Sequence, residues 1–275
     1  MIETMAIKLI ASDMDGTLLS SGIAISEKNK DAIRKAVDSG IVFLIATGRM
    51  YVSAQPYAEQ LGLDVPLVTY NGALVEGSLS HKVYYHNPIP LETALEALAC
   101  CQARKYHIQA YVNDKLYVKE ADSLSEEYRR LSNVPPIPVG DKLYHITEAP
   151  TKMLVMTGDD DFKEIFNDLT ERFRGRLTVV SSKDHFIDLI APGVNKWNAV
   201  KAVAQMYKIR PEEIMCIGDS GNDVVMIRNA GLGVAVDNAN DAAREAAKVV
   251  VPSNDDDGVA RAIELALTKQ VSVPD

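Results

Sequence analysis

The sequence predicts an α/β protein, with a three-layer Rossmann-like parallel sheet as its core and a smaller α+β module inserted into it. Two observations indicate this class. At both ends of the chain, short apolar runs alternate with helical patterns, which is typical of parallel strands buried between two layers of helices. Between them, paired β-prone runs mix with helices, which is typical of an antiparallel α+β module.

Length and charge limit the domain organisation and the partners. The 275 residues suit two domains of ordinary size. We expect residues 1–83 and 190–275 to form the α/β core domain and residues 84–189 to form the insert. A formal net charge of −9 argues against nucleic acid or an anionic membrane as a partner, because both select basic surfaces. It is compatible with a small anionic substrate, since a metal ion can reverse the field inside one cleft.

The first arm of the core should begin with a buried strand at 6–12. Ser26 is a suitable N-cap for the helix that follows, and Gly40 is a suitable residue to end it. The other elements expected in this arm are a strand at 41–46, a helix around 51–61 and a strand near 67–69.

In the insert, Asn113-Asp114-Lys115 separates two β-prone runs and predicts a hairpin, while 135–138, with three prolines, predicts a loop. The other expected elements of the insert are a β-prone run at 83–85, helices at 91–105, 123–132 and 160–173, and strands at 153–156, 177–181 and 186–190. The second arm should contain strands at 213–217, 232–236 and 248–251, and helices at 196–207, 222–230, 240–247 and 257–268.

The three cysteines and the apolar runs indicate the compartment. The cysteine number is odd and there is no CxxC pair, so a reducing cytosol is favoured over a disulfide framework. No apolar run reaches the length of a membrane span, and residues 1–5 do not resemble the start of a signal peptide. We therefore expect a cytoplasmic protein, and the sequence leaves its oligomeric state open.

Three carboxylates follow buried strands. Asp13 and Asp15 come directly after the first strand, and Asp219 comes shortly after the strand at 213–217. Ligands in open α/β sheets bind at the carboxyl edge of the strands. Carboxylates so close together repel one another unless a cation or a shared proton compensates. Hard oxygen ligands suit Mg²⁺, so a magnesium site is expected at this edge.

Two further features are consistent with phosphate binding. Thr47 and Gly48 end the strand at 41–46, where a hydroxyl and backbone N–H groups at a helix start can hold phosphate oxygens. Lys196 opens the helix at 196–207, a place where a lone lysine is most often simply exposed. Asn222 and Asp223 follow Asp219 on the next turn.

These residues carry a resemblance to a known family. The four motifs Asp13-Met14-Asp15-Gly16-Thr17, Thr47-Gly48-Arg49, Lys196 and Gly218-Asp219-Ser220-Gly221-Asn222-Asp223 resemble, in order, those of the haloacid dehalogenase-like phosphatases. The insert resembles the cap of the Cof-type branch in position and pattern. The stretches TYNGALV at 69–75 and DDDGVARAI at 255–263 also resemble that branch.

The resemblance implies a mechanism and a ligand set. Asp13 would attack phosphorus and become an aspartyl phosphate, and Asp15 would protonate the leaving alcohol and then activate water. Mg²⁺ would be held by the Asp13 and Asp219 carboxylates and the Asp15 backbone carbonyl, with Asp223 ordering the outer shell of the metal. The groups implied to hold the phosphoryl oxygens are the backbone N–H groups of Met14 and Gly48, the Thr47 hydroxyl, Lys196 and Asn222.

The expected substrate is a small phosphorylated metabolite, such as a sugar phosphate. Two other functions stay open: a phosphomutase or phosphotransferase of the same fold, and a non-catalytic regulator that binds a phosphometabolite. The intact set of Asp13, Asp15, Lys196 and Asp219 argues against the regulator, because a binding protein needs no nucleophile. One position departs from the family: Trp197 stands where the family usually has glycine, so its indole could crowd the helix start or line the pocket.

Overall fold

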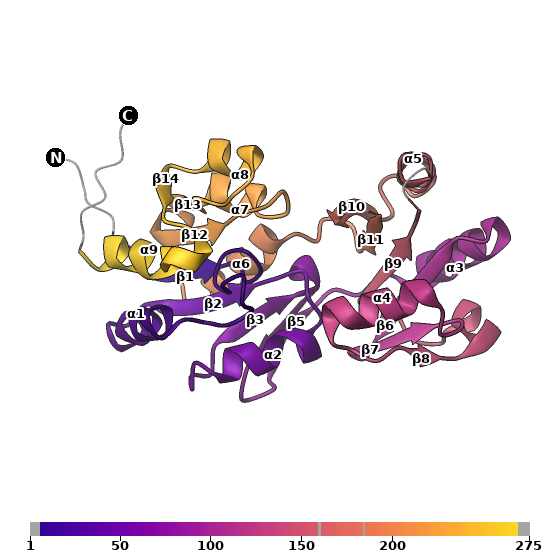
Figure 1. The fold of residues 1–275 in the computed structure, drawn as a ribbon, viewed down its shortest axis with the longest axis horizontal. Helices are drawn as coiled ribbons and strands as arrows, with labels where there is room; N and C mark the ends of the chain where they lie inside the picture. The colour runs from indigo at the N-terminus through magenta and orange to yellow at the C-terminus, as the bar shows by residue number, and fades with distance from the viewer. Residues whose placement is uncertain (1–5, 159–160, 184, 269–275) are drawn as a thin grey trace. The chain divides into compact units, whose positions relative to one another are not determined.

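The computed structural model describes residues 6–158, 161–183 and 185–268 (Figure 1). These residues form two compact units. The first unit contains the described residues up to Thr47, 54–85, and those from Asn195 onward; the second contains 48–53 and the described residues of 86–194. Residues 1–5, on which the signal-peptide expectation depends, lie outside the described residues, as does residue 160 of an expected helix.

The first unit is built on an eight-stranded sheet in the order β14-β13-β12-β1-β2-β3-β4-β5. The strand β1 pairs in parallel with β2 on one side and with β12 on the other, so the two arms of the chain meet at the centre. The strands of this sheet are β1 (Leu9–Ser12), β2 (Val42–Ala46), β3 (Pro66–Thr69), β4 (Leu74–Gly77), β5 (Val83–His86), β12 (Ile214–Gly218), β13 (Leu232–Val236) and β14 (Val249–Val251).

Helices cover both faces of this sheet and make the expected three layers (Figure 1). The helices α6 (Lys196–Met206) and α7 (Val224–Asn229) pack on the face that carries Leu9, Ala11 and Leu44. The helices α1 (Glu27–Asp38) and α9 (Gly258–Leu267) pack against each other, α1 against β2 and α9 against β12. Ser26 caps α1 as expected, since its hydroxyl accepts from the N–H of Asn29 at 3.1 Å. The remaining helices of this region are α2 (Tyr51–Glu59) and α8 (Asp241–Ala246).

The second unit is a mainly antiparallel six-stranded sheet in the order β10-β11-β9-β6-β7-β8. The helices α3 (Leu91–Arg104) and α5 (Phe162–Arg172) pack on one face, against Ala110 and Val155 among others. On α4 (Ser123–Ser132), Tyr128 packs against the ring of Tyr111, which alternates with Ala110 and so marks the opposite face. The strands are β6 (His107–Val112), β7 (Lys115–Val118), β8 (Ile137–Pro138), β9 (Lys152–Met156), β10 (Thr178–Lys183) and β11 (Phe186–Ile190).

One local expectation was wrong, and one strand was not expected. The segment 135–138 is not wholly loop, because Ile137–Pro138 forms the short strand β8 beside β7. Proline is tolerated there because β8 is an edge strand. Along its outer edge no neighbouring strand needs a backbone N–H donor, and proline has none. The strand β4 was missed: after a turn at 70–72 the chain folds back antiparallel on β3.

The cysteines and the helices bear on two further expectations from the sequence. All three cysteines are free, and Cys101 and Cys216 are buried. No helix within the described ranges is long and apolar enough to cross a membrane.

Candidate active site

Asp13 and Asp219 come together because β1 and β12 are parallel neighbours. Each aspartate follows the last residue of its strand, so both lie at the carboxyl edge of the sheet. The backbone N–H of Asp13 donates to the carbonyl of Ile217 at 2.8 Å and extends the pairing by one residue. Asp13 is only 4% exposed, so its charge needs partners inside the protein.

Lys196 supplies one such partner. It is the first residue of α6, whose N-cap is Asn195, and its side chain is 1% exposed. Its Nζ lies 2.5 Å from Oδ1 of Asp13 and 2.7 Å from Oδ1 of Asp223. The exposed lysine that is usual at such a position is therefore not what the structure shows: Lys196 is buried between two carboxylates.

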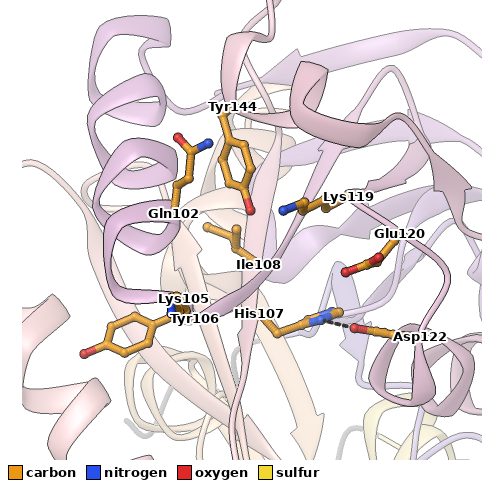
Figure 2. A pocket seen from close by; sticks show the side chains of 9 residues that line it. All are labelled: Gln102, Lys105, Tyr106, His107, Ile108, Lys119, Glu120, Asp122 and Tyr144. Atoms are coloured by element: carbon orange, nitrogen blue, oxygen red, sulfur yellow. Dashed lines mark hydrogen bonds and ion pairs between the residues drawn. The ribbon is translucent and has the colours of Figure 1, made fainter.

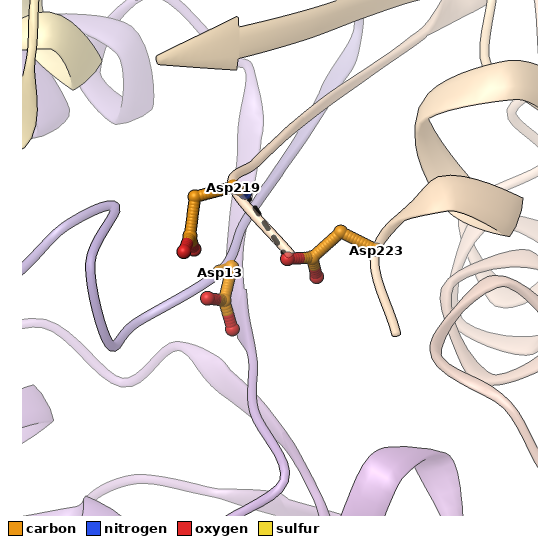
Figure 3. Close-up of side chains that lie close together, drawn as sticks. All are labelled: Asp13, Asp219 and Asp223. Atoms are coloured by element: carbon orange, nitrogen blue, oxygen red, sulfur yellow. Dashed lines mark hydrogen bonds between the residues drawn. The ribbon is translucent and has the colours of Figure 1, made fainter. Parts of the chain in front are cut away.

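Asp223 links the loop that follows β12 to this cluster. It is fully buried, and its Oδ2 accepts from the backbone N–H groups of Asp219 and Ser220, both at 3.1 Å. One carboxylate oxygen from each of Asp13, Asp219 and Asp223 lies within 4.8 Å of the other two (Figure 3). The carboxylate of Asp15, which is exposed, does not belong to this group.

The cluster carries more negative than positive charge. Burial raises the pKa of Asp13 well above its usual range, and the neighbouring carboxylate of Asp223 raises it further. Burial also raises the pKa of Asp219. Burial lowers the pKa of Lys196, but the carboxylates of Asp13 and Asp223 outweigh this effect, so the pKa is raised and the ammonium stays charged. One ammonium among three carboxylates leaves a site that favours a further cation.

The loop after β1 is shaped to approach Asp219. Gly16 has φ +74°, a conformation that favours glycine, and a Cβ there would lie 2.8 Å from Oδ2 of Asp219 and displace that carboxylate. The hydroxyl of Thr17 is buried and donates to Oδ1 of Asp219 at 2.8 Å. The motif contained Thr17, but sequence reasoning assigned no role to it. Its contact partner lies 202 positions away in the chain, so no local signal identified it.

The groups expected to hold phosphate are distributed as follows. Thr47 is 1% exposed at the end of β2, where its N–H donates to the carbonyl of Val68 at 2.8 Å. Met14 is fully buried beside Asp13, and Asn222 is exposed on the loop after β12. Gly48 follows Thr47 in the chain and is the first residue of the segment 48–53 of the second unit.

Trp197 does not crowd the start of α6. It is 7% exposed and packs in the apolar cluster between α6 and the sheet, with Lys201 Nζ 5.9 Å from its ring centroid. The start of α6 is regular, since the side chain of Asn195 accepts from the N–H of Asn198 at 2.9 Å.

The second unit has a pocket of its own, of about 470 Å³, next to the start of β6 (Figure 2). Ile108 and Tyr144 line it, as does His107, whose Nδ1 lies 2.9 Å from Oδ2 of Asp122. The lysines at its rim, Lys105 and Lys119, are exposed. Among the described residues, the cluster of three acidic groups that could hold a metal ion is the one around Asp13, not one at this pocket.

Comparison with known proteins identifies the family. The haloacid dehalogenase-like hydrolase family matches residues 10–263. The chain belongs to this family. Two curated Bacillus subtilis proteins, both named 5-amino-6-(5-phospho-D-ribitylamino)uracil phosphatase, are similar to it: YitU at 31% identity over 92% of this chain and 95% of its own length, and YcsE at 33% over 95% and 96%. A haloacid dehalogenase-like hydrolase of solved structure from Bacteroides thetaiotaomicron has a TM-score of 0.85 and 28% identity, and covers 94% of this chain and 98% of its own.

These findings confirm several predictions from the sequence. The Cof-type haloacid dehalogenase-like resemblance, the Rossmann-like α/β core with an α+β insert, and the assignment as a phosphatase hydrolase are all confirmed. The match to the haloacid dehalogenase-like family begins at β1 and ends in α9, so it includes both arms of the first unit and the whole second unit.

Proposed function

We propose that the chain is a Mg²⁺-dependent phosphatase that hydrolyses phosphate monoesters of small metabolites through an aspartyl phosphate on Asp13. The observation that carries the proposal is the buried contact between Asp13 Oδ1 and Lys196 Nζ, at 2.5 Å, inside a cluster of three carboxylates. A site that only bound phosphate would not need this excess of negative charge.

The donor set fits a magnesium ion. Asp13 and Asp219 offer carboxylate oxygens on the same sheet edge, and hard oxygen ligands are what Mg²⁺ prefers. With the Asp15 backbone carbonyl they would hold the ion, while Asp223, already bonded to Lys196, would order its surroundings. The bound ion would neutralise charge on the phosphoryl group, so that one anion can attack another.

The chemical steps fall to Asp13 and Asp15. A carboxylate oxygen of Asp13 forms a bond to phosphorus as the bond from phosphorus to the ester oxygen breaks. The carboxylic acid of Asp15 gives its proton to the leaving alkoxide. In the second half, Asp15 takes a proton from water, whose oxygen displaces Asp13 from phosphorus and releases inorganic phosphate.

Positioning of the phosphoryl oxygens would come from groups around this edge. The Thr47 hydroxyl, the N–H groups of Met14 and Gly48, Lys196 and the Asn222 amide are the proposed donors. Donors held in place before the reaction stabilise the transition state without reorganisation. Lys196 would serve twice, since it is already held by Asp13 and Asp223.

The two units would divide the work. We assign catalysis to the α/β core, residues 1–83 and 190–275, and selection of the leaving group to the insert, residues 84–189. The named activity of the two Bacillus relatives makes 5-amino-6-(5-phospho-D-ribitylamino)uracil the first natural substrate to assay. A cytoplasmic location agrees with such a substrate.

The test is release of inorganic phosphate from p-nitrophenyl phosphate and from a panel of phosphorylated metabolites, with Mg²⁺ and with excess EDTA. We expect activity only with Mg²⁺. Asp13→Asn should lower turnover by about 10³-fold or more, because an amide cannot act as the nucleophile. The matched control is Asp31→Asn on the exposed surface of α1, which should keep full turnover.

Three results would overturn the proposal. Full activity in EDTA would exclude the metal, and near-normal turnover in folded Asp13→Asn protein would exclude the covalent route. Formation of a substrate isomer without phosphate release would indicate a phosphomutase instead.

A further inference from the structure

We propose that Asn71 is a positioning residue that fixes the side-chain amide of Asn222 in the orientation needed to donate to the phosphoryl group. The inference rests on the proposed function, which places Asn222 at that group. Asn71 lies in the turn Tyr70–Gly72 between β3 and β4, within the stretch TYNGALV, and none of the four motifs contains it.

The amide of Asn222 is held at both ends. Its Nδ2 donates to Oδ1 of Asn71 at 3.0 Å. Its Oδ1 lies 2.8 Å from the hydroxyl of Ser220, which shares its proton with Oδ2 of Asp223 at 3.2 Å. A flip of the amide would turn its oxygen towards the Asn71 oxygen, so two acceptors would face each other. The second N–H of the amide therefore has a defined direction, although Asn222 itself is exposed on its loop.

Asn71 is itself rigidly placed. It is 4% exposed and has a left-handed backbone, with φ 57° and ψ 23°. This conformation is unfavourable for most residues but tolerated by asparagine, and it persists where the surroundings determine it. Its N–H donates at 3.0 Å to the carbonyl of Thr47, the residue whose hydroxyl is a proposed phosphate donor.

The next residue connects the turn to Lys196. Gly72 has φ +106°, and a Cβ there would lie 2.4 Å from the carbonyl oxygen of Asn195, the N-cap of the helix that Lys196 begins. Only glycine permits this approach. The turn at 70–72 thus contacts the segments that carry Thr47, Lys196 and Asn222. A buried and strained turn of this kind can set their relative positions, and Asn71 provides its side-chain contact to Asn222.

The first experiment measures the contact without any reaction. Asn71→Gly keeps the left-handed backbone and removes the acceptor, so in ¹H–¹⁵N spectra the Asn222 side-chain amide signals should shift. Those signals are assigned by their loss in Asn222→Ala. The matched control is Asn133→Gly in the second unit, because Asn133 has nearly the same backbone angles, φ 56° and ψ 24°. The control should leave the Asn222 signals in place.

The second experiment measures binding of inorganic phosphate as a competitive inhibitor of p-nitrophenyl phosphate hydrolysis. We expect Asn71→Gly to raise the inhibition constant about 5- to 10-fold, the effect of losing roughly one net hydrogen bond. Asn222→Ala should raise it at least as much. Adding Asn71→Gly to Asn222→Ala should change it less than about 2-fold, because residues that act through one contact are not additive.

The outcomes separate this inference from the proposed function. Unchanged Asn222 amide signals in Asn71→Gly, or multiplying effects in the double variant, would overturn the positioning role while leaving the phosphatase intact. An unshifted phosphate constant in Asn222→Ala would remove Asn222 from the phosphate site and overturn the inference with it. Absence of phosphate release by the unaltered protein would instead overturn the proposed function, and the amide signals would still report whether Asn71 holds Asn222.

Discussion

Among the residues whose burial is described, each of the two units buries one lysine, and the two sites differ in their charge balance. In the first unit, Lys196 is 1% exposed and contacts Asp13 and Asp223, with Asp219 beside them. In the second unit, the side chain of Lys152 is 5% exposed, lies 2.9 Å from Oδ1 of Asp188 and packs over the Tyr111 ring at 4.8 Å. Both lysines have a raised pKa: burial lowers it, but the carboxylates outweigh burial.

The difference indicates what each site is for. Lys152 and Asp188 lie on the neighbouring strands β9 and β11, and the buried ammonium there has a carboxylate oxygen within 2.9 Å. Around Lys196 the carboxylates outnumber the ammonium three to one among the described residues. A buried charge that lacks a partner is costly. An unbalanced buried cluster at the carboxyl edge of parallel strands is therefore better explained by a bound cation and substrate than by stability.

The largest expected effect tests the unbalanced cluster. Lys196→Met should lower turnover by about 10³-fold, because it removes a positive charge in contact with the proposed nucleophile. The measurement is phosphate release at saturating substrate and Mg²⁺. The control is Lys201→Met, one turn further along α6, where the ammonium lies over the Trp197 ring and contacts no carboxylate of the cluster. If folded Lys196→Met protein kept a turnover within a few-fold of the unaltered protein, Lys196 would have no catalytic role. The two buried lysines would then not differ in function.

The second effect concerns stability instead of catalysis. Lys152→Met should destabilise the second unit by about 3–5 kcal/mol, because it removes the ammonium that lies 2.9 Å from the buried Asp188 carboxylate. Hydrogen exchange in β9 and β11 should report the loss. Trp197, the single tryptophan, lies in the first unit, so its fluorescence should change little. In the double variant Lys152→Met with Asp188→Leu, most of the stability should return. No recovery there would show that the pair does more than balance charge.

Much of the first unit could be predicted because its signals are local. The strand before Asp13, the Ser26 cap and the strand before Asp219 are each encoded within a few neighbouring residues. Parallel strands also place their carboxyl ends at one edge by necessity. The hairpin at Asn113-Asp114 was predictable for the same reason, since both residues adopt the positive φ that such a turn requires.

The remainder depends on contacts between distant segments. The roles of Thr17 and Asn71 depend on partners that lie 202 and 151 positions away in the chain. No local sequence pattern around either residue identifies those partners. Burial of Lys196 was missed because a lysine at a helix start is usually exposed. Its two carboxylate partners are distant in the chain: Asp13 directly follows β1, and Asp223 is the N-cap of α7. Short edge strands such as β8 carry too few residues to show a period.

The third prediction concerns Thr17, whose hydroxyl holds Asp219 from the side of the first motif. Thr17→Val keeps the shape and removes the donor. The Mg²⁺ concentration for half-maximal activity should rise about 10-fold, the usual cost of losing a hydrogen bond to a ligand of the metal. Thr170→Val on α5 is the control, because that hydroxyl bonds only to the carbonyl of Phe166 in its own helix. An unchanged Mg²⁺ requirement in Thr17→Val would show that Asp219 needs no such support.

The smallest effect concerns the acid response of the first unit. The hydrogen bond from Lys8 lowers the pKa of Glu213 from about 4.5 to about 2, and the backbone N–H of Arg210 adds to the shift. Since the folded-state pKa lies below the unfolded value, the contribution of Glu213 is present above about pH 4.5 and is lost as the pH falls towards 2. Glu213→Gln should therefore flatten the fall of the first unit's melting temperature between pH 5 and 2.5, measured by Trp197 fluorescence. Glu212→Gln, an exposed neighbour, should keep the original slope. If both variants follow the unaltered protein, acid sensitivity in this unit comes from other carboxylates, and the buried cluster around Asp13 becomes the first to examine.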